Sequence, residues 1–137
     1  TVSIMSKKLL LIEDEEFIRE VYKDELQSAG FLVDGFATGS EGLKAFKENY
    51  YDLVVLDIIL PDMNGLHVLQ EMKEDSLKKD TPVLILSNAE QDIVIKHGLQ
   101  FGAEDYMLKV QSTPDMIVDK IKFILDKKNP QKANPLS

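Results

Sequence analysis

Residues 53–65 read Leu-Val-Val-Leu-Asp-Ile-Ile-Leu-Pro-Asp-Met-Asn-Gly. The four consecutive apolar residues at the start, 53–56, are typical of a strand that is covered on both faces. This strand pattern ends in a carboxylate, Asp57, and the chain then breaks at Pro61 and Gly65. Such a sequence places the carboxylate at the rim of a sheet, where it can serve as a metal ligand or as a nucleophile.

Two further apolar runs, residues 9–12 and 83–86, repeat the pattern of a buried strand. Segments with the apolar spacing of helices lie between the runs. A more polar edge strand is expected at residues 31–37 and a short strand at residues 106–108. The sequence therefore predicts an α/β fold with a single doubly wound parallel sheet of five strands, in the order 2-1-3-4-5, and helices on both faces.

The chain has 137 residues and 44% hydrophobic content, which suits one domain with one core. We expect the folded domain at residues 7–126, preceded by a disordered or cloning-derived arm at 1–6. Its last helix is predicted to start with Thr113 as N-cap and Pro114 at the first helical position. Residues 127–137 are polar and contain prolines, which predicts a tail or the start of a linker.

The charge balance and the residue types that are missing restrict the possible functions. Sixteen basic against 24 acidic residues give a net charge of −8, which argues against direct binding to nucleic acid. The chain has no cysteine, which excludes disulfides, thiolate zinc sites and cysteine-based catalysis. No apolar stretch is long enough to span a membrane, and no signal peptide is recognisable. We expect a cytoplasmic protein without a membrane partner.

Three acidic residues are predicted to meet at one edge of the sheet. Glu13 and Asp14 follow the first strand and Asp57 follows the third, and these strands are neighbours in the predicted order. Two unit charges about 4 Å apart repel by roughly 4 kcal/mol at an effective dielectric constant of about 20. A divalent cation would relieve that repulsion, and a set of oxygen ligands without histidine or cysteine suits Mg²⁺ or Mn²⁺.

A hydroxyl and an ammonium group are expected on the same rim. Ser87 follows the fourth predicted strand and Lys109 follows the fifth. Both groups donate hydrogen bonds to oxygen, and lysine adds a positive charge, as a phosphoryl group requires. Together with Asp57 and a metal, they predict a site of phosphoryl transfer.

At this point the chain resembles the receiver domain of two-component response regulators, similar to the chemotaxis regulators, over nearly all of residues 7–126. The order and spacing of the shared residues make the match specific. The matching residues are Glu13, Asp14, Asp57, Pro61, Gly65, Ser87, Tyr106 and Lys109. The resemblance implies the flavodoxin-like form of the predicted fold.

The resemblance also implies a role for each of these positions. Asp57 accepts a phosphoryl group from a sensor histidine kinase or a phosphotransfer protein, and Lys109 and Ser87 assist it. Mg²⁺ or Mn²⁺ is held by Glu13, Asp14, Asp57 and the backbone carbonyl of Ile59. Ser87 and Tyr106 then switch a face formed by the fourth helix, fifth strand and fifth helix, which an output partner contacts. The protein is expected to be a monomer or a weak dimer, and no enzyme beyond its own phosphorylation and slow dephosphorylation.

Three positions depart from the pattern of the family. Val110 replaces the usual proline after the lysine, so the Lys109–Val110 bond is either trans with an altered loop or cis at a cost of about 3–4 kcal/mol. Glu13 is one methylene longer than the usual aspartate and contacts the metal either directly or through water. Asn88 either crowds the phosphoryl group or donates a hydrogen bond to it.

Apolar residues at two other places carry further predictions. Ile59 and Ala89 stand where the family tunes hydrolysis of the phosphoaspartate, and neither can orient water, which predicts a long-lived phosphoryl group. The fourth predicted helix has more apolar residues than one buried stripe needs, so either partner contact or plain burial explains them. These residues are Ile93, Val94, Ile95, Leu99 and Phe101.

Three other classes of protein share parts of this pattern. A pseudo-receiver would signal through contacts alone, but it would be expected to lack Asp57 or Lys109, and both are present. A phosphatase of the haloacid dehalogenase type needs a second acid two residues after the nucleophile, where this chain has Ile59. A flavin or dinucleotide carrier needs a phosphate cradle rich in glycine or hydroxyl groups after the first strand, and this turn is acidic.

Overall fold

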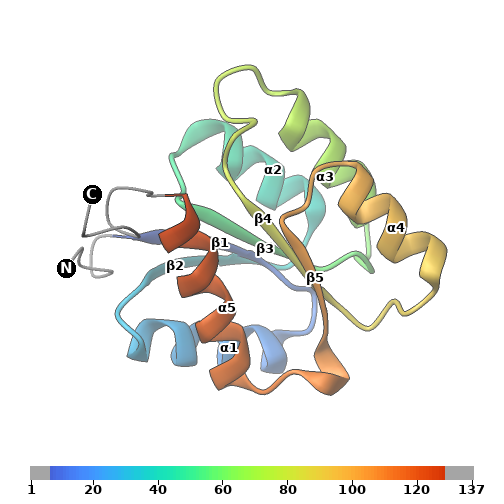
Figure 1. The fold of residues 1–137 in the computed structure, drawn as a ribbon. Coiled ribbons are helices and arrows are strands. Elements are labelled where there is room, and N and C mark those ends of the chain that lie inside the picture. Colours follow the sequence, from blue (N-terminus) through green and yellow to red (C-terminus); the bar gives the residue numbers. More distant parts are fainter. Residues whose placement is uncertain (1–6, 129–137) are drawn as a thin grey trace.

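The centre of the sheet is β3 (Leu53–Leu56), whose four side chains are all buried. In the computed structural model, β3 pairs in parallel with β1 (Lys8–Ile12) on one side and with β4 (Val83–Ser87) on the other. β2 (Leu32–Phe36) and β5 (Asp105–Leu108) form the two edges (Figure 1). The order β2-β1-β3-β4-β5 confirms the predicted doubly wound sheet.

Helices cover both faces of this sheet. Within the part of the chain that the structure describes, they are α1 (Glu16–Ser28), α2 (Gly39–Glu48), α3 (Gly65–Glu74), α4 (Asp92–Gln100) and α5 (Pro114–Lys127). Figure 1 shows α1 and α5 on one face and α2, α3 and α4 on the other. Each face has its own apolar core, because successive residues of a strand point to opposite sides.

The structure describes residues 7–128, so the predicted arm at 1–6 and residues 129–137 lie outside it. α5 begins as predicted, since the Thr113 hydroxyl accepts a hydrogen bond from the Met116 N–H at 3.2 Å and Pro114 is the first helical residue. The helix continues through Lys127, one residue beyond the boundary expected at 126. No helix among the described residues is long and apolar enough to cross a bilayer.

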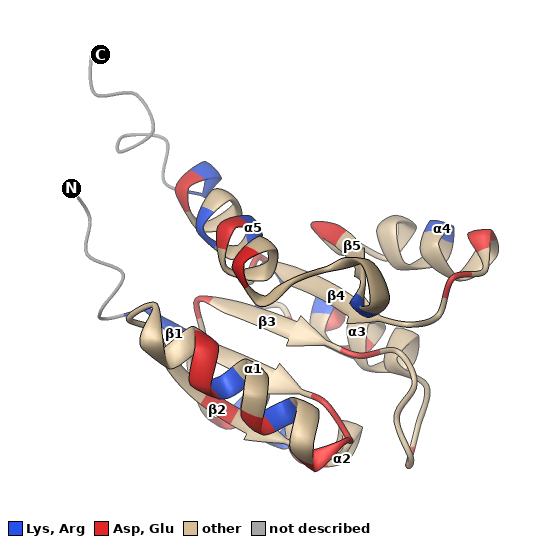
Figure 2. Ribbon diagram, turned by 90° about the horizontal axis from the view of Figure 1, so that it is seen from below, with Lys and Arg blue, Asp and Glu red and all other residues tan. Residues whose placement is uncertain are grey.

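The carboxyl ends of all the parallel strands lie at one edge of the sheet, as Figure 2 shows for the acidic residues directly after β1 and β3. A short 3-10 turn, Lys109–Gln111, follows β5 at the same edge. The edge therefore brings together residues that are far apart in the sequence, which is the general location of ligand sites in open α/β sheets.

Candidate functional site

Asp57 directly follows β3, and only 4% of its surface is exposed. Its Oδ1 accepts hydrogen bonds from the Ser87 hydroxyl at 2.6 Å and from the Ile59 N–H at 3.1 Å. Its Oδ2 accepts from the Lys109 ammonium at 2.6 Å. A carboxylate this deeply buried needs such charge-assisted partners, and the structure supplies them from three different elements.

Lys109 also forms an ion pair with Glu13, which is almost fully buried at the end of β1. The ammonium therefore lies between two carboxylates, and 9% of the lysine side chain is exposed. Burial alone would lower the pKa of Lys109, but the hydrogen bonds with Asp57 and Glu13 outweigh it and raise the pKa. The lysine stays charged and partly neutralises the acidic cluster.

Burial raises the pKa of Glu13, and the hydrogen bonds from Lys109 and from the Glu15 N–H oppose that shift. The Glu15 N–H donates to Glu13 Oε2 at 3.0 Å, so both carboxylate oxygens of Glu13 have partners. Glu13 is thus held toward the interior by the lysine on one side and by its own loop on the other.

The predicted acidic cluster is present. One carboxylate oxygen each of Glu13, Asp14 and Asp57 lies within 4.8 Å of the others. Two oxygens on opposite sides of Mg²⁺ are about 4.2 Å apart, since each lies about 2.1 Å from the ion. Asp14 is exposed whereas the other two are buried, so the cluster opens to water on one side. Oxygen donors at this spacing with room for water fit a divalent cation such as Mg²⁺.

The loop after β3 approaches α3 very closely at Gly65. A Cβ at this position would lie 2.3 Å from the Asp57 carbonyl oxygen and 2.5 Å from the Ile58 Cα. The Gly65 N–H donates to the Ile58 carbonyl at 2.8 Å, and a bridge joins Ile59 and Asn64. Gly65 is therefore required by the turn that orients Asp57, which explains its place in the predicted motif.

Ser87 and Tyr106 are linked through Ala89. The Ala89 N–H donates to the Ser87 hydroxyl oxygen at 3.3 Å, and the Tyr106 hydroxyl donates to the Ala89 carbonyl at 2.6 Å. The Tyr106 ring is half-buried and packs against the core. Tyr106 is therefore a core side chain that is also joined to Asp57, through Ala89 and Ser87, by a series of three hydrogen bonds.

None of the peptide bonds between described residues is cis, so the Lys109–Val110 bond is trans. The Val110 N–H donates to Asn88 Oδ1 at 3.1 Å, and this bond joins the loops after β4 and β5. Lys109 nevertheless reaches both Asp57 and Glu13. Of the two alternatives the trans bond is therefore the observed one, and Lys109 keeps both of its contacts.

Arg19 supports the acidic loop but was not predicted from the sequence. Its guanidinium donates to the carbonyl oxygens of Glu13 at 2.8 Å and of Asp14 at 3.3 Å. These bonds hold the backbone of both predicted metal ligands from the first turn of α1. The spacing from Asp14 to Arg19 matches no general motif, so no signal in the sequence singles out this residue.

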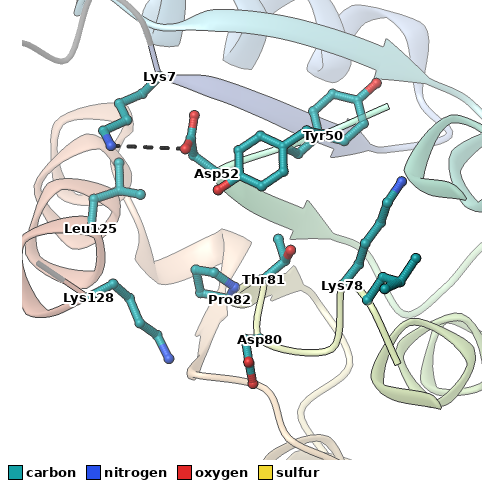
Figure 3. Close-up of a pocket in the computed structure, with 11 residues that line it drawn as sticks. Lys7, Tyr50, Asp52, Lys78, Asp80, Thr81, Pro82, Leu125 and Lys128 are labelled. Carbon is teal, nitrogen blue, oxygen red and sulfur yellow. Dashed lines mark ion pairs between the residues drawn. The ribbon is translucent and has the colours of Figure 1, made fainter. Parts of the chain in front are cut away.

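A separate cavity of about 350 Å³ lies at the opposite end of the strands, beside the start of β1, β3 and β4 (Figure 3). Its lysines are already engaged. Lys7 lies 4.0 Å from Asp52, Lys128 pairs with Glu104, and Lys78 donates to three carbonyl groups at the end of α2. Asp52 in the lining is engaged as well, since it also accepts a hydrogen bond from the Lys8 N–H at 2.8 Å.

A comparison with protein families agrees with this geometry. The model of the response regulator receiver domain matches residues 9–122, and the chain belongs to this family. Receiver domains are signalling modules of two-component systems, and the acidic pocket of the family binds Mg²⁺. The predicted resemblance is thus confirmed.

Individual relatives place the chain more closely. It is 41% identical over 102 residues to the transcriptional regulatory protein QseB of Haemophilus influenzae, which covers 74% of this chain and 45% of that protein. It is 34% identical over 121 residues to the alkaline phosphatase synthesis transcriptional regulatory protein PhoP of Bacillus subtilis, covering 88% of this chain and 49% of the relative. The chain thus spans about half the length of these curated relatives.

Solved structures show the same fold. A CheY-like response regulator receiver domain protein from Methanospirillum hungatei superposes with a TM-score of 0.86 at 27% sequence identity. The match covers 92% of this chain and 98% of that one. The predicted five-stranded flavodoxin-like fold is therefore confirmed by the strand order and by this structural neighbour.

Proposed function

We propose that this chain is a phosphoacceptor receiver, in which Asp57 takes a phosphoryl group from a histidine of a sensor kinase or phosphotransfer protein. The observation that carries the proposal is the surrounding of one carboxylate. Asp57 accepts hydrogen bonds from the Ser87 hydroxyl and the Lys109 ammonium. Its carboxylate lies close to those of Glu13 and Asp14.

The reaction transfers one phosphoryl group between two side chains. The P–N bond of the donor phosphohistidine breaks as a P–O bond to an Asp57 oxygen forms, and the imidazole leaves with the electron pair of the broken bond. Lys109, now on Asp57 Oδ2, would move with its charge to the phosphoryl oxygens. Such transfer depends mainly on placement and on neutralising charge, which this rim supplies.

We propose that Glu13, Asp14, Asp57 and the Ile59 carbonyl hold Mg²⁺, or Mn²⁺, during this reaction. When bound, the cation supplies positive charge to the phosphoryl oxygens. Glu13 is now paired with Lys109, so its role in metal binding requires that the lysine gives up part of that contact. The Ile59 N–H bond to Asp57 brings the Ile59 backbone beside the pocket.

The output of the domain would be a change of the face formed by α4, β5 and α5. A series of hydrogen bonds leads from Asp57 toward that face through Ser87, Ala89 and Tyr106. Ile93 and Leu99 of α4 are 56% and 45% exposed, so part of the apolar surplus of this helix is free to contact a partner. Val94 packs against the core instead.

The proposed setting is the cytoplasm, where a sensor kinase or phosphotransfer protein would meet the domain as a monomer or weak dimer. The net charge of −8 disfavours direct binding of nucleic acid by this segment, so the proposed output partner is a protein surface. The output partner is either a separate protein or another part of a longer chain.

The test is incubation with Mg²⁺ and phosphoramidate, a small donor with a P–N bond, followed by mass spectrometry. One added phosphoryl group is expected on the wild type and none on Asp57→Asn. Asp24→Asn, which changes an exposed aspartate of α1, should be modified like the wild type. An unmodified wild type would instead support the pseudo-receiver, which acts through contacts without phosphorylation.

A further inference from the structure

The tip of the loop between β3 and α3 is bound to the first turn of α2. Asp62 Oδ1 accepts from the Gly39 N–H at 2.8 Å, and Oδ2 accepts from the Ser40 N–H at 2.9 Å and from the Ser40 hydroxyl at 2.7 Å. The first N–H groups of a helix have no partner inside the helix, and a negative charge is favoured there. Asp62 thus gives two of these groups a partner from a different loop.

The next residue of the loop, Met63, packs closely against the same turn of α2. A Cβ on Gly39 would lie 2.6 Å from Met63 Cγ and 2.7 Å from Met63 Sδ. Met63 therefore occupies the space that a side chain at position 39 would need. A polar contact and an apolar contact from adjacent loop residues hold the loop on α2.

Only two residues separate Asp62 from Ile59, whose N–H donates to Asp57 Oδ1. One of them is Pro61, whose ring restricts the backbone between the two points. A β-bridge pairs Ile59 with Asn64, so Asp62 lies within a short loop whose two ends are held together. A displacement of the Asp62 end would therefore be passed to the backbone of Ile59.

We propose that Asp62 is a positioning residue that anchors the loop to α2 and so keeps the Ile59 carbonyl placed for the metal. This inference rests on the proposed function, because it concerns the metal site of that reaction. Asp62 itself is exposed and contacts neither the acidic cluster nor the phosphoacceptor directly in the described hydrogen bonds.

The experiment compares Asp62→Ala and Asp62→Asn with Thr38→Ala. Thr38 is the N-cap of the same helix, and its hydroxyl accepts from the Glu41 N–H at 3.1 Å. Its loss weakens α2 at the same end without removing the contact to the loop. Three quantities are measured for each variant: the unfolding temperature, amide hydrogen exchange of residues 59–64 without metal, and the Mg²⁺ dissociation constant by calorimetry.

For Asp62→Ala we expect exchange in residues 59–64 to be about tenfold faster, because the loop opens locally. Mg²⁺ affinity should fall roughly threefold to tenfold, less than the roughly 10–100-fold typical of a residue that bonds a ligand directly. Asp62→Asn keeps one carbonyl oxygen and should lie between the wild type and Asp62→Ala. Thr38→Ala should lower the unfolding temperature and leave the Mg²⁺ affinity unchanged.

Unchanged exchange or unchanged Mg²⁺ affinity in Asp62→Ala, with normal binding by the wild type, overturns the positioning role and leaves the proposed function intact. An equal loss of affinity in Thr38→Ala also overturns it, since general weakening of α2 would then suffice. A wild type that binds no Mg²⁺ removes the metal site of the proposed function, and the positioning role with it.

Discussion

The hydroxyl of Ser87 donates to Asp57 Oδ1 at 2.6 Å, across 30 positions of sequence. Both residues are almost fully buried, and each stands at the carboxyl end of its strand, β4 or β3. The bond exists before any phosphoryl group is attached. The oxygen that would be phosphorylated, or its neighbour, is therefore already in contact with the residue proposed to respond.

Replacing Ser87 with Ala removes this bond and the contact to the Ala89 N–H. A hydrogen bond from this hydroxyl to the charged phosphoryl oxygens in the transition state would contribute about 1.5–3 kcal/mol, so we expect phosphorylation by phosphoramidate to slow by at least about tenfold. Ser87→Thr keeps the hydroxyl and should retain most of the rate. The rates are measured by mass spectrometry over time, and equal rates for Ser87→Ala and the wild type would contradict the role of the hydroxyl.

Replacing Lys109 with Met leaves the buried carboxylates of Glu13 and Asp57 without their shared cation. Removing one partner of a buried ion pair costs about 3–5 kcal/mol, so the free energy of unfolding without metal should fall by about that amount. Mg²⁺ should stabilise this variant more than the wild type, since it replaces the missing charge and binds only the folded state.

Urea unfolding with and without saturating Mg²⁺ measures both effects of the lysine. Lys96→Met, which alters an exposed lysine of α4, serves as the control and should behave like the wild type. If Mg²⁺ stabilised Lys109→Met no more than the wild type, the lysine and the metal would not act on the same carboxylates.

The phosphoryl group on Asp57 should persist for minutes or longer. Ile59 is 60% exposed and Ala89 is buried, and neither can orient or activate an attacking water. In Ile59→Asn the phosphoaspartate should hydrolyse at least about tenfold faster, because a side-chain amide at position 59 can position the attacking water. Loss of the added mass is followed after the donor is removed, with Ile93→Asn on α4 as control. Loss from the wild type within seconds would refute the prediction.

Gly65→Ala should destabilise the fold by about 3 kcal/mol, because the new Cβ would overlap backbone atoms that have no room to move. The nearest of them is the Asp57 carbonyl oxygen at 2.3 Å. Gly35→Ala is the matched control, since its Cβ would meet only the Arg19 side chain at 3.4 Å and should cost little. Denaturant unfolding of both variants compares the two sites, and similar losses would contradict this account.

Asp62 should titrate well below the usual aspartate pKa of about 3.9. Its hydrogen bonds from the Ser40 hydroxyl, the Ser40 N–H and the Gly39 N–H lower the pKa to about 2. Because the folded pKa lies below the unfolded one, the anchor is complete above about pH 4 and is lost as the pH falls toward about 2.

NMR of the Asp62 carboxyl carbon measures this titration directly. Ser40→Ala should raise the midpoint toward the usual value, since the Ser40 hydroxyl has the largest effect on it. A wild-type midpoint near 4 would show that the bonds to α2 are not maintained in solution.

Much of the fold was predictable because three strands carry apolar residues at every position. Such runs are stable in water only when both faces are covered, which requires a parallel sheet between layers of helices. The residues that follow the strands of such a sheet meet at its carboxyl end, so Glu13, Asp14, Asp57, Ser87 and Lys109 could be assigned to one site from the sequence. The structure brings all five together.

The supporting contacts could not be predicted in this way. Arg19 and Asp62 are ordinary charged residues of a helix and a turn, and nothing in their local sequence names their partners. The same holds for the choice between a trans and a cis bond before Val110, and for the contact between Val110 and Asn88. Each of these features depends on the position of a loop that is distant in the sequence.

The amino-acid order alone thus settled the strand pattern, the edge at which the polar residues gather and the identity of the acidic cluster, because periodicity and burial act along a short stretch of chain. Tertiary structure decided which oxygen each donor reaches, that one ammonium lies between Glu13 and Asp57, and how the loop tip is anchored to α2. Those distances depend on packing between segments that are remote in sequence, and no local pattern encodes them.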